Sequence, residues 1–316
     1  MSANHVILGT GAIGRAIMEE LLKRGESVRM VNRSGKMDEV PAGVEVKAAE
    51  LYDQAQVKEV TRGAKVVYQS AQPEYFEWTE KFPPLQKSII DGLTGSNSKL
   101  VIVENLYMYG ESNGKPMTED FPHNAHTRKG KVRSEISKAA LAAHQEGKVK
   151  VVIGRGSDFF GPWGLQQTTM GARAFYPILS GKAAQMAGRT DVPHTHTFTK
   201  DFGRALVILG ERSEADGQVW HVPNDMPRVT QGEMVKMFAE EAGMPVKISS
   251  MGKLGWVFIG LFVPPAKEMV EMMYEFEKPF VVDSSRFEKV FGMKATPMKE
   301  AIKETVAWYR SHPEKK

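Results

Sequence analysis

Three glycines near the start of the chain have the spacing of a phosphate-binding turn. They follow the apolar run HVILG and precede the pattern of an amphipathic helix. In such a turn the first glycine permits a tight bend, the second lets the backbone approach a pyrophosphate, and the third lets helix and strand pack closely. Amide groups at the helix N-terminus then hold the phosphates. The alternative is an ordinary tight turn. The predicted dinucleotide site consists of Gly9, Thr10, Gly11, Ala12, Ile13 and Gly14.

The residues after the second predicted strand indicate which dinucleotide would bind. An NAD site usually has Asp or Glu there, which accepts hydrogen bonds from the ribose hydroxyls. The segment VNRSGK instead offers Asn32, Arg33, Ser34 and Lys36. Arg33 can hold a 2′-phosphate with its bidentate fork, and Ser34 can add a hydroxyl donor. The sequence therefore favours NADP(H), and the alternative is a solvated basic turn.

Two histidines in VPHTHTFTKD could place both imidazoles on one face of a strand. His194 and His196 have no third ligand in register, and the chain has no cysteine, so we expect no metal site. Asp201, at the end of the same segment, is expected to cap the helix FGRALVILG.

The elements that would position these residues alternate in type along the first half of the chain. The β-like runs are HVILG, SVRMVNR, VEVKAAEL, AKVVYQSA, KLVIVENL and VKVVIGRGSDFFGP, and helical patterns separate them. This alternation predicts an α/β fold of the Rossmann type, a doubly wound parallel sheet with helices on both faces. We expect residues 1–165 to form the NADP-binding domain and 166–316 a smaller substrate-capping region. Part of about 195–225 is expected to return to the main sheet.

Composition limits the class of protein and its partners. With 41% hydrophobic and 25% charged residues the chain is typical of globular proteins, and without cysteine it has no disulfides or thiolate chemistry. This composition is compatible with a cytoplasmic protein. The apolar run LGWVFIGLFVPPA is shorter than the roughly 20 residues that cross a bilayer, so we expect a buried or pocket-lining helix and no membrane partner. The net charge of +4 is scattered among acids, so we expect no nucleic-acid partner.

Several of these segments together resemble the extended short-chain dehydrogenase/reductase superfamily, which contains nucleotide-sugar epimerases, dehydratases and related reductases. The likeness runs through the glycine loop, VVYQSAQP, VIVENLYMYGE, KGKVRSE, GRGSDFFGPW and GQVWHVPND. The usual loop of the superfamily is G-x-x-G-x-x-G, and Leu8 stands at its first glycine. The resemblance implies further cofactor contacts at Leu51, Ser70, Ala71, Lys131 and Asp158.

The catalytic residues of the superfamily, Ser or Thr followed by Tyr-x-x-x-Lys, are only partly present. Counting from the Tyr-Gly pair at Tyr109 puts Asn105 in place of the serine. The segment KVRSE supplies the lysine as Lys131, which puts Thr127 in place of the tyrosine. In the superfamily the lysine holds the nicotinamide ribose and lowers the pKa of the tyrosine. A threonine hydroxyl is too weak an acid for that role, although it could donate a weak hydrogen bond.

Tyr107 and a water are the remaining candidate proton donors. In the sugar dehydratases of the superfamily the corresponding position, two residues before the conserved tyrosine, carries an acid that faces the substrate. The phenol of Tyr107 could therefore donate the proton, or it could be an aromatic wall. The amide of Asn105 could donate a hydrogen bond to a substrate oxygen, or it could satisfy the backbone at a strand end.

Three functions fit these residues. The first is an NADP(H)-dependent oxidoreductase that reduces a small carbonyl or conjugated-carbonyl substrate. The second is an epimerase or dehydratase acting on a nucleotide sugar, although that cycle needs a strong base and the serine and tyrosine are absent. The third is a non-catalytic NADP(H)-binding sensor. Members of the superfamily often dimerise through the helix that begins near Lys131, and the lysine-rich sequence of that helix leaves a homodimer open.

Overall fold

The helices and strands form where the sequence alternates apolar strands with amphipathic helices. The structure is a computed structural model that describes residues 3–262 and 268–314. It divides into two units. The first contains residues 1–108, 128–156 and 202–222, and the second contains 109–127, 157–201 and 223–316.

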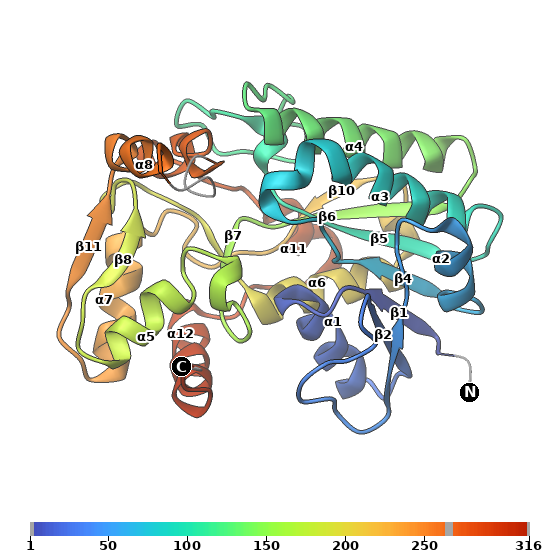
Figure 1. Ribbon diagram of the computed structural model, residues 1–316, viewed down its shortest axis with the longest axis horizontal. Helices are drawn as coiled ribbons and strands as arrows, with labels where there is room; N and C mark the ends of the chain where they lie inside the picture. Colours follow the sequence, from blue (N-terminus) through green and yellow to red (C-terminus); the bar gives the residue numbers. More distant parts are fainter. Residues whose placement is uncertain (1–2, 263–267, 315–316) are drawn as a thin grey trace. The chain divides into compact units, whose positions relative to one another are not determined.

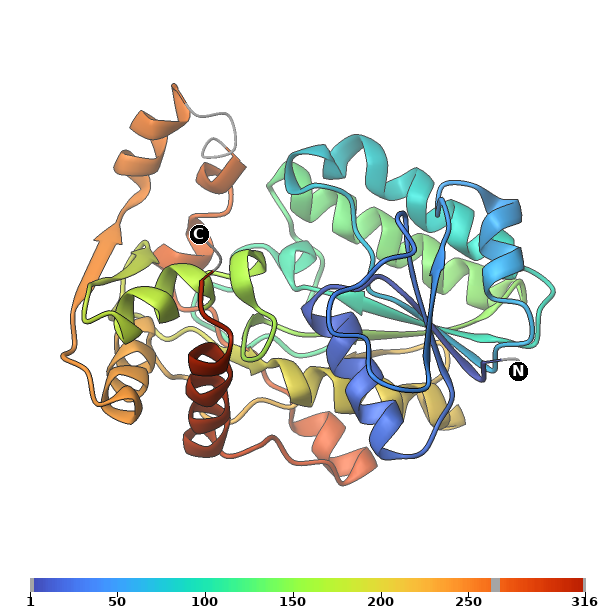
Figure 2. The ribbon, with the colours of Figure 1, turned by 60° about the horizontal axis from the view of Figure 1, so that its bottom comes forward.

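The first unit is built on one parallel sheet. Its seven strands run in the order β10-β6-β5-β4-β1-β2-β3, and each adjacent pair is parallel. Helices α2, α3 and α4 cover one face, and α1 and α6 cover the other (Figure 1 and Figure 2). The strand order reverses between β1 and β4, and ligands of doubly wound sheets bind beside such a point. The predicted Rossmann-type fold is confirmed. The bounds are β1 His5–Leu8, α1 Ala12–Lys23, β2 Val28–Asn32, β3 Val44–Ala48, α2 Gln54–Val60, β4 Val66–Gln69, η1 Tyr75–Glu77, α3 Trp78–Leu93, β5 Lys99–Glu104, α4 Arg128–Gln145, β6 Lys150–Arg155, α6 Thr199–Glu211, η4 Ser213–Ala215 and β10 Val219–His221.

Apolar side chains of the central strands hold α2, α3 and α4 against the sheet. Val67 of β4 and Leu100 of β5 are fully buried and pack in one core with Trp78 and Ile89 of α3. Burial of a side chain of this size contributes roughly 1.5–3 kcal/mol. The strands read as nearly continuous apolar runs because both faces of the sheet are covered.

The second unit has two short parallel strand pairs and a group of packed helices. β8 pairs with β11, and β7 pairs with β9. Apolar residues of α5, α7 and α12 form its core, with Phe175, Phe238 and Tyr309 in contact at ring-centroid distances of 4.2 Å and 4.7 Å. A short helix, η2 (Tyr107–Tyr109), crosses from the first unit to the second. The bounds are β7 Asp158–Phe160, η3 Leu165–Gln167, α5 Ala172–Leu179, β8 Ala184–Ala187, β9 His196–Phe198, α7 Gln231–Ala242, β11 Ile248–Met251, α8 Lys253–Gly260, α10 Tyr274–Glu277, α11 Ser285–Phe291 and α12 Met298–Ser311.

The units differ from the expected division at residue 165. The run expected as one strand from Val149 breaks after Arg155, because β7 pairs with β9 of the second unit and not with the main sheet. Residues 109–127 also belong to the second unit, where the backbone N of Met117 donates to the carbonyl of Val281 at 2.8 Å. Residues 202–222 count with the first unit, where β10 pairs with β6.

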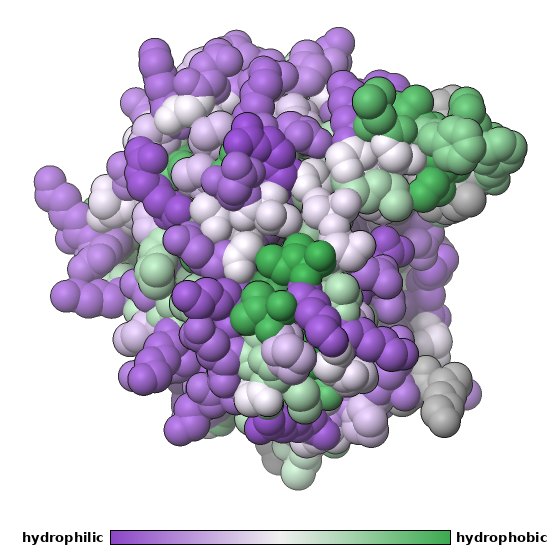
Figure 3. All heavy atoms as spheres, turned by 90° about the vertical axis from the view of Figure 1, so that its left-hand side faces the viewer, coloured by the Kyte–Doolittle hydropathy of each residue, from purple (hydrophilic) through white to green (hydrophobic). Residues whose placement is uncertain are grey.

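Helix α8 and the two residues after it carry an exposed apolar surface, which differs from the expectation of a buried or pocket-lining helix. The side chains of Leu254, Phe258, Leu261 and Phe262 are 66% to 86% exposed. Figure 3 shows apolar side chains gathered at the upper right of the face that it presents. Residues 263–266 of the run lie outside the described part of the chain. No helix within the described part of the chain is long and apolar enough to cross a membrane.

Candidate cofactor and active site

The glycine loop lies between β1 and α1 and is closely packed. Gly9 has φ of +117°, a conformation that side chains rarely adopt. A Cβ atom at Gly9 would lie 2.6 Å from both the Ser70 hydroxyl oxygen and the Ala71 backbone nitrogen. At Gly14 it would lie 2.3 Å from the carbonyl oxygen of Gly9. Glycine is therefore required at both positions, in agreement with the reasons that predict a dinucleotide turn.

The N-terminal end of α1 fits a pyrophosphate. Gly11 is the N-cap residue, and no side chain caps the helix. The first amide groups of a helix have no partner within the helix itself, and the helix dipole favours negative charge there. Ser70 is held beside the loop, where its hydroxyl donates to the carbonyl of Leu8 at 3.2 Å. Residues 9–14, Ser70 and Ala71 are thus brought together at the switch point of the sheet.

The turn after β2 is organised by Asn32. Its Oδ1 accepts hydrogen bonds from the backbone of Ser34 (3.0 Å) and Gly35 (2.7 Å). Its Nδ2 donates to the carbonyl of Lys36 (2.7 Å) and to the hydroxyl of Thr10 in the glycine loop (3.2 Å). Asn32 therefore shapes the turn and joins it to the loop. Its hydrogen-bonding groups are used within the chain, so its predicted cofactor role is best described as positioning.

Arg33 projects from that turn and is exposed. No ion pair or hydrogen bond of its guanidinium is recorded within the described residues, so the charge is available to a ligand. The turn has no carboxylate until Asp38. Leu51, predicted to contact the cofactor, is 6% exposed and packs in the core of the first unit.

The predicted catalytic residues are divided between the two units. Lys131 lies on α4 of the first unit, where it is exposed and makes no recorded ion pair among the described residues. Asn105 and Tyr107 follow β5, also in the first unit. Thr127 is 6% exposed and, like Asp158, belongs to the second unit.

The carboxyl end of β5 presents an amide and a phenol. Asn105 Oδ1 accepts a hydrogen bond from the backbone N of Tyr107 at 3.4 Å, which leaves the amide nitrogen of Asn105 as a donor. Tyr107 is half-buried, and its ring lies 5.9 Å from that of Trp78 between centroids. The structure is therefore compatible with a structural role and with a substrate-facing role for both Asn105 and Tyr107. Tyr109 is fully buried against the rings of Phe121 and His123, as expected for a structural residue.

Asp158 belongs to a buried polar cluster of the second unit. His194 donates from Nδ1 to the backbone carbonyl of Glu275 (3.0 Å), and its Nε2 lies 2.9 Å from Asp158 Oδ2. Burial raises the pKa of Asp158, but the hydrogen bond from His194 more than offsets this and lowers it below the usual value. Burial raises the pKa of Glu275 well above its ordinary value. The two ring nitrogens of His196 have no hydrogen-bond partner within the described chain, and burial lowers its pKa to about 3.

Asp201 is not the N-cap residue of its helix. Because α6 begins at Thr199, Asp201 lies in the first turn, and its carboxylate accepts hydrogen bonds from the backbone N (2.7 Å) and hydroxyl (2.8 Å) of Thr296. The residue therefore ties α6 to the segment before α12. A long-range partner of this kind leaves no local pattern in the sequence.

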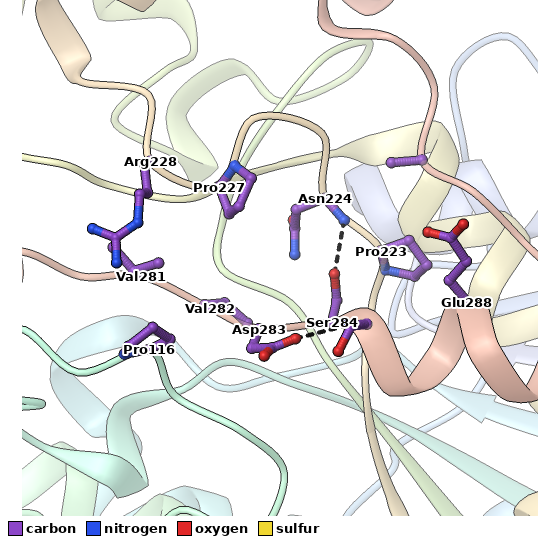
Figure 4. Close-up of a pocket in the computed structure, with 12 residues that line it drawn as sticks. Pro116, Pro223, Asn224, Pro227, Arg228, Val281, Val282, Asp283, Ser284 and Glu288 are labelled. Atoms are coloured by element: carbon purple, nitrogen blue, oxygen red, sulfur yellow. Dashed lines mark hydrogen bonds between the residues drawn. The ribbon is translucent and has the colours of Figure 1, made fainter.

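A pocket of about 340 Å³ lies in the second unit and contains none of the predicted site residues (Figure 4). In Figure 4, Arg228 and Glu288 lie on opposite sides of the pocket, and Asp283 lies below the space between them. The backbone N of Asn224 donates to the hydroxyl of Ser284 at 3.2 Å across its wall. The sequence gives no motif for this pocket, since its lining comes from three separate segments.

A cluster of charged residues that the sequence did not predict lies under the end of β5. Arg155 donates from Nε to Glu104 Oε2 (2.9 Å) and from Nη2 to the hydroxyl of Ser137 (2.7 Å). Arg133 of α4 lies over the rings of Trp78 and Phe82. The sequence does hold one signal for this cluster. Lys129 and Arg133 are four residues apart and therefore lie on the same face of a helix, which is the buried face of α4.

These features define a doubly wound α/β protein with a dinucleotide-type turn. A family model, the NAD dependent epimerase/dehydratase family, matches residues 6–222. The chain belongs to this family, which is one of enzymes that use a pyridine nucleotide, and membership in the extended short-chain dehydrogenase/reductase superfamily is confirmed.

Solved structures with the same fold are distant in sequence. An epimerase from Methanothermobacter thermautotrophicus has a TM-score of 0.80 at 14% identity, over 98% of this chain and 93% of that one. A dTDP-glucose 4,6-dehydratase from Streptomyces venezuelae, solved with NAD, has a TM-score of 0.78 at 14% identity, over 97% of this chain and 96% of that one. The UDP-glucose 4-epimerase of Thermotoga maritima has a TM-score of 0.78 at 16% identity, over 98% of this chain and 99% of that one. No curated protein matches the chain.

Proposed function

We propose that the protein is an NADP(H)-dependent oxidoreductase that reduces a small carbonyl or conjugated-carbonyl substrate. One observation carries the proposal. The first unit alone supplies a glycine loop, the exposed cations Arg33 and Lys131, and two hydrogen-bonding side chains at the end of β5. The proposal assigns the loop and Arg33 to the cofactor and the end of β5 to the substrate.

Each residue has a distinct role in this proposal. Bound NADPH would supply a hydride. Lys131 would hold the nicotinamide ribose, and the Asn105 amide would donate a hydrogen bond to the substrate oxygen. The Tyr107 phenol would then donate a proton to that oxygen, since the ordinary acidity of a phenol is far closer to neutral than that of a threonine hydroxyl.

Arg33→Ala should change which cofactor binds. A charge-assisted hydrogen bond contributes about 1.5–3 kcal/mol, so we expect NADPH to bind about 10- to 100-fold more weakly. NADH, which lacks the 2′-phosphate, should bind as before. Fluorescence titration of the purified protein with each cofactor measures both constants. Arg62→Ala removes another exposed arginine of the same unit, one that pairs with Glu59, and serves as the control. Equal losses for NADPH and NADH would contradict NADP specificity.

Tyr107→Phe should abolish most of the turnover without loss of cofactor. General acid catalysis contributes about 10²- to 10⁴-fold, so kcat with a panel of carbonyl substrates should fall by that order while NADPH still binds. Lys131→Ala should weaken NADPH binding and turnover together. Lys138→Ala is the matched control, because Lys138 is an exposed lysine of the same helix. Full activity in Tyr107→Phe would remove Tyr107 from the mechanism.

A non-catalytic NADP(H) sensor is the second candidate. The observation that favours it is that a buried threonine, Thr127, stands where the superfamily has its catalytic tyrosine. Tight NADPH binding without turnover on carbonyls, UDP-glucose or dTDP-glucose would support the sensor. Turnover confined to the nucleotide sugars would favour an epimerase or dehydratase.

A further inference from the structure

Arg133 is a buried cation with few partners. Its side chain projects from α4 and is 4% exposed, with the guanidinium 4.3 Å from the ring centroids of both Trp78 and Phe82. Nη2 donates to Gln72 Oε1 at 3.3 Å. Nε and Nη1 have no hydrogen-bond partner within the described residues. Such a charge is costly to bury unless another group compensates it.

Arg133 lies near a buried ion pair of which it is not a member. Glu104 is 2% exposed and forms its ion pair with Arg155, which is 1% exposed. Arg133 forms no ion pair within the described residues, so its guanidinium lies near this pair without a carboxylate partner of its own. Lys129, 2% exposed, adds a second cation on the same helix, with Nζ 4.5 Å from the ring centroid of Tyr75.

Two phenols lie around the same ring as Arg133: the Trp78 ring, over which Arg133 lies, is 5.9 Å from the ring of Tyr107 and 5.1 Å from that of Tyr75 between centroids. The electrostatic interactions of Arg133, after burial itself, are with Glu104, Tyr107, Tyr75 and Arg155. Burial lowers the pKa of Arg133 to about 10, so the group remains charged at neutral pH. Because electrostatic coupling is reciprocal, a charge on the Tyr107 oxygen is stabilised by Arg133 as much as Arg133 is stabilised by it.

We propose that Arg133 stabilises the ionised form of Tyr107 and is thereby a positioning residue for proton transfer from that phenol. The inference rests on the proposed function for its catalytic consequence. When the proton leaves, the O–H bond of Tyr107 breaks and an O–H bond forms on the substrate oxygen. The electron pair stays on the phenolate, near the positive charge of Arg133, until solvent returns a proton. A cation on the inward face of α4 thus acts on a phenol at the end of β5.

The ionisation of Tyr107 can be measured without any substrate. The chain has eight tyrosines, so the near-ultraviolet absorbance of phenolate is recorded against pH for the full chain and for Tyr107→Phe, and the difference reports Tyr107. In Arg133→Met, which keeps an apolar stem against the two rings, Tyr107 should ionise about 1 pH unit higher or more. Arg133→Lys should restore most of this shift. Glu104→Gln removes the nearby negative charge and should shift the ionisation in the opposite direction.

Lys138→Met is the matched control, since it removes one exposed positive charge from the same helix and should leave the ionisation of Tyr107 in place. An unchanged ionisation in folded Arg133→Met overturns the inference. If that variant does not fold, an unchanged value in Glu104→Gln overturns it equally. The alkaline limb of the pH profile of kcat should move with the absorbance. If the absorbance shifts while Tyr107→Phe retains turnover, Arg133 tunes the phenol as inferred and the proposed proton donor is wrong.

Discussion

Gly9→Ala is expected to destabilise the first unit by roughly 2–5 kcal/mol and to abolish NADPH binding. The new methyl group would have to occupy a residue at φ of +117°, and it would lie 2.6 Å from two atoms of the neighbouring strand end. One of those atoms is the backbone nitrogen of Ala71, which donates to the carbonyl of Leu8 at 2.6 Å and cannot retreat without breaking that hydrogen bond. Urea unfolding and fluorescence titration with NADPH measure the two effects.

Gly25→Ala is the matched control for this substitution. Gly25 also has a positive φ, +77°, but no atom lies within 4 Å of the position of its Cβ. Gly25→Ala should therefore lower the free energy of unfolding only by the strain of a positive φ, about 1–2 kcal/mol, and should leave NADPH binding unchanged. If the two substitutions cost the same, close packing against Ser70 and Ala71 is not the reason for glycine at position 9.

The fold was predictable because both faces of the sheet are covered. Strands in that position are mostly apolar, so β1, β2, β4 and β5 stand out as short, largely apolar runs between helical patterns. The glycine loop was predictable for a similar reason, since steric limits at Gly9 and Gly14 act within a few residues of the chain. Both signals are local, and local signals survive in a sequence.

The features that were not predicted depend on contacts far apart in the chain. The break between β6 and β7 follows from pairing with β9, some forty residues later, and nothing in the run around Gly156 requires it. Asp201 binds Thr296, and the apolar run of α8 faces outward. The two aromatic rings against Arg133 belong to α3, and no local pattern around Arg133 predicts them. The sequence identifies which side chains could do chemistry, but their partners come from tertiary structure.

His196 should make the second unit sensitive to acid. The imidazole is 1% exposed, its two nitrogens have no partner within the described chain, and burial lowers its pKa from 6.5 to about 3. Between these values the unfolded chain binds a proton that the folded chain excludes, so stability rises with pH and is lost as the pH falls from 6.5 toward 3. The full loss is up to about 4 to 5 kcal/mol, and about 2 kcal/mol of it should appear between pH 7 and pH 5.

His196→Leu should remove this dependence. Leucine has a similar size, and because the imidazole makes no hydrogen bond, the exchange should leave stability at neutral pH unchanged or raise it. The free energy of unfolding in urea, measured at pH 7 and pH 5 for both proteins, gives the difference. His196→Asn also cannot titrate in this range but buries an amide, so it should flatten the pH dependence while losing stability at both pH values.

Groups near His196 also titrate, so the pH dependence of the wild-type protein alone does not isolate the contribution of His196. Asp158, opposite His196 in the β7–β9 pair, has a lowered pKa, so its contribution is present above the ordinary carboxyl range and is lost only in stronger acid. Glu275 has a raised pKa, so its contribution to the stability of the folded protein falls as the pH rises. This trend is opposite to that of His196. His194 lies between the two acidic residues, with its ring centroid 4.8 Å from that of His196. The wild-type profile is therefore a sum of opposing slopes. If the same pH dependence between pH 7 and pH 5 persists in His196→Leu, His196 is not the source of the acid sensitivity.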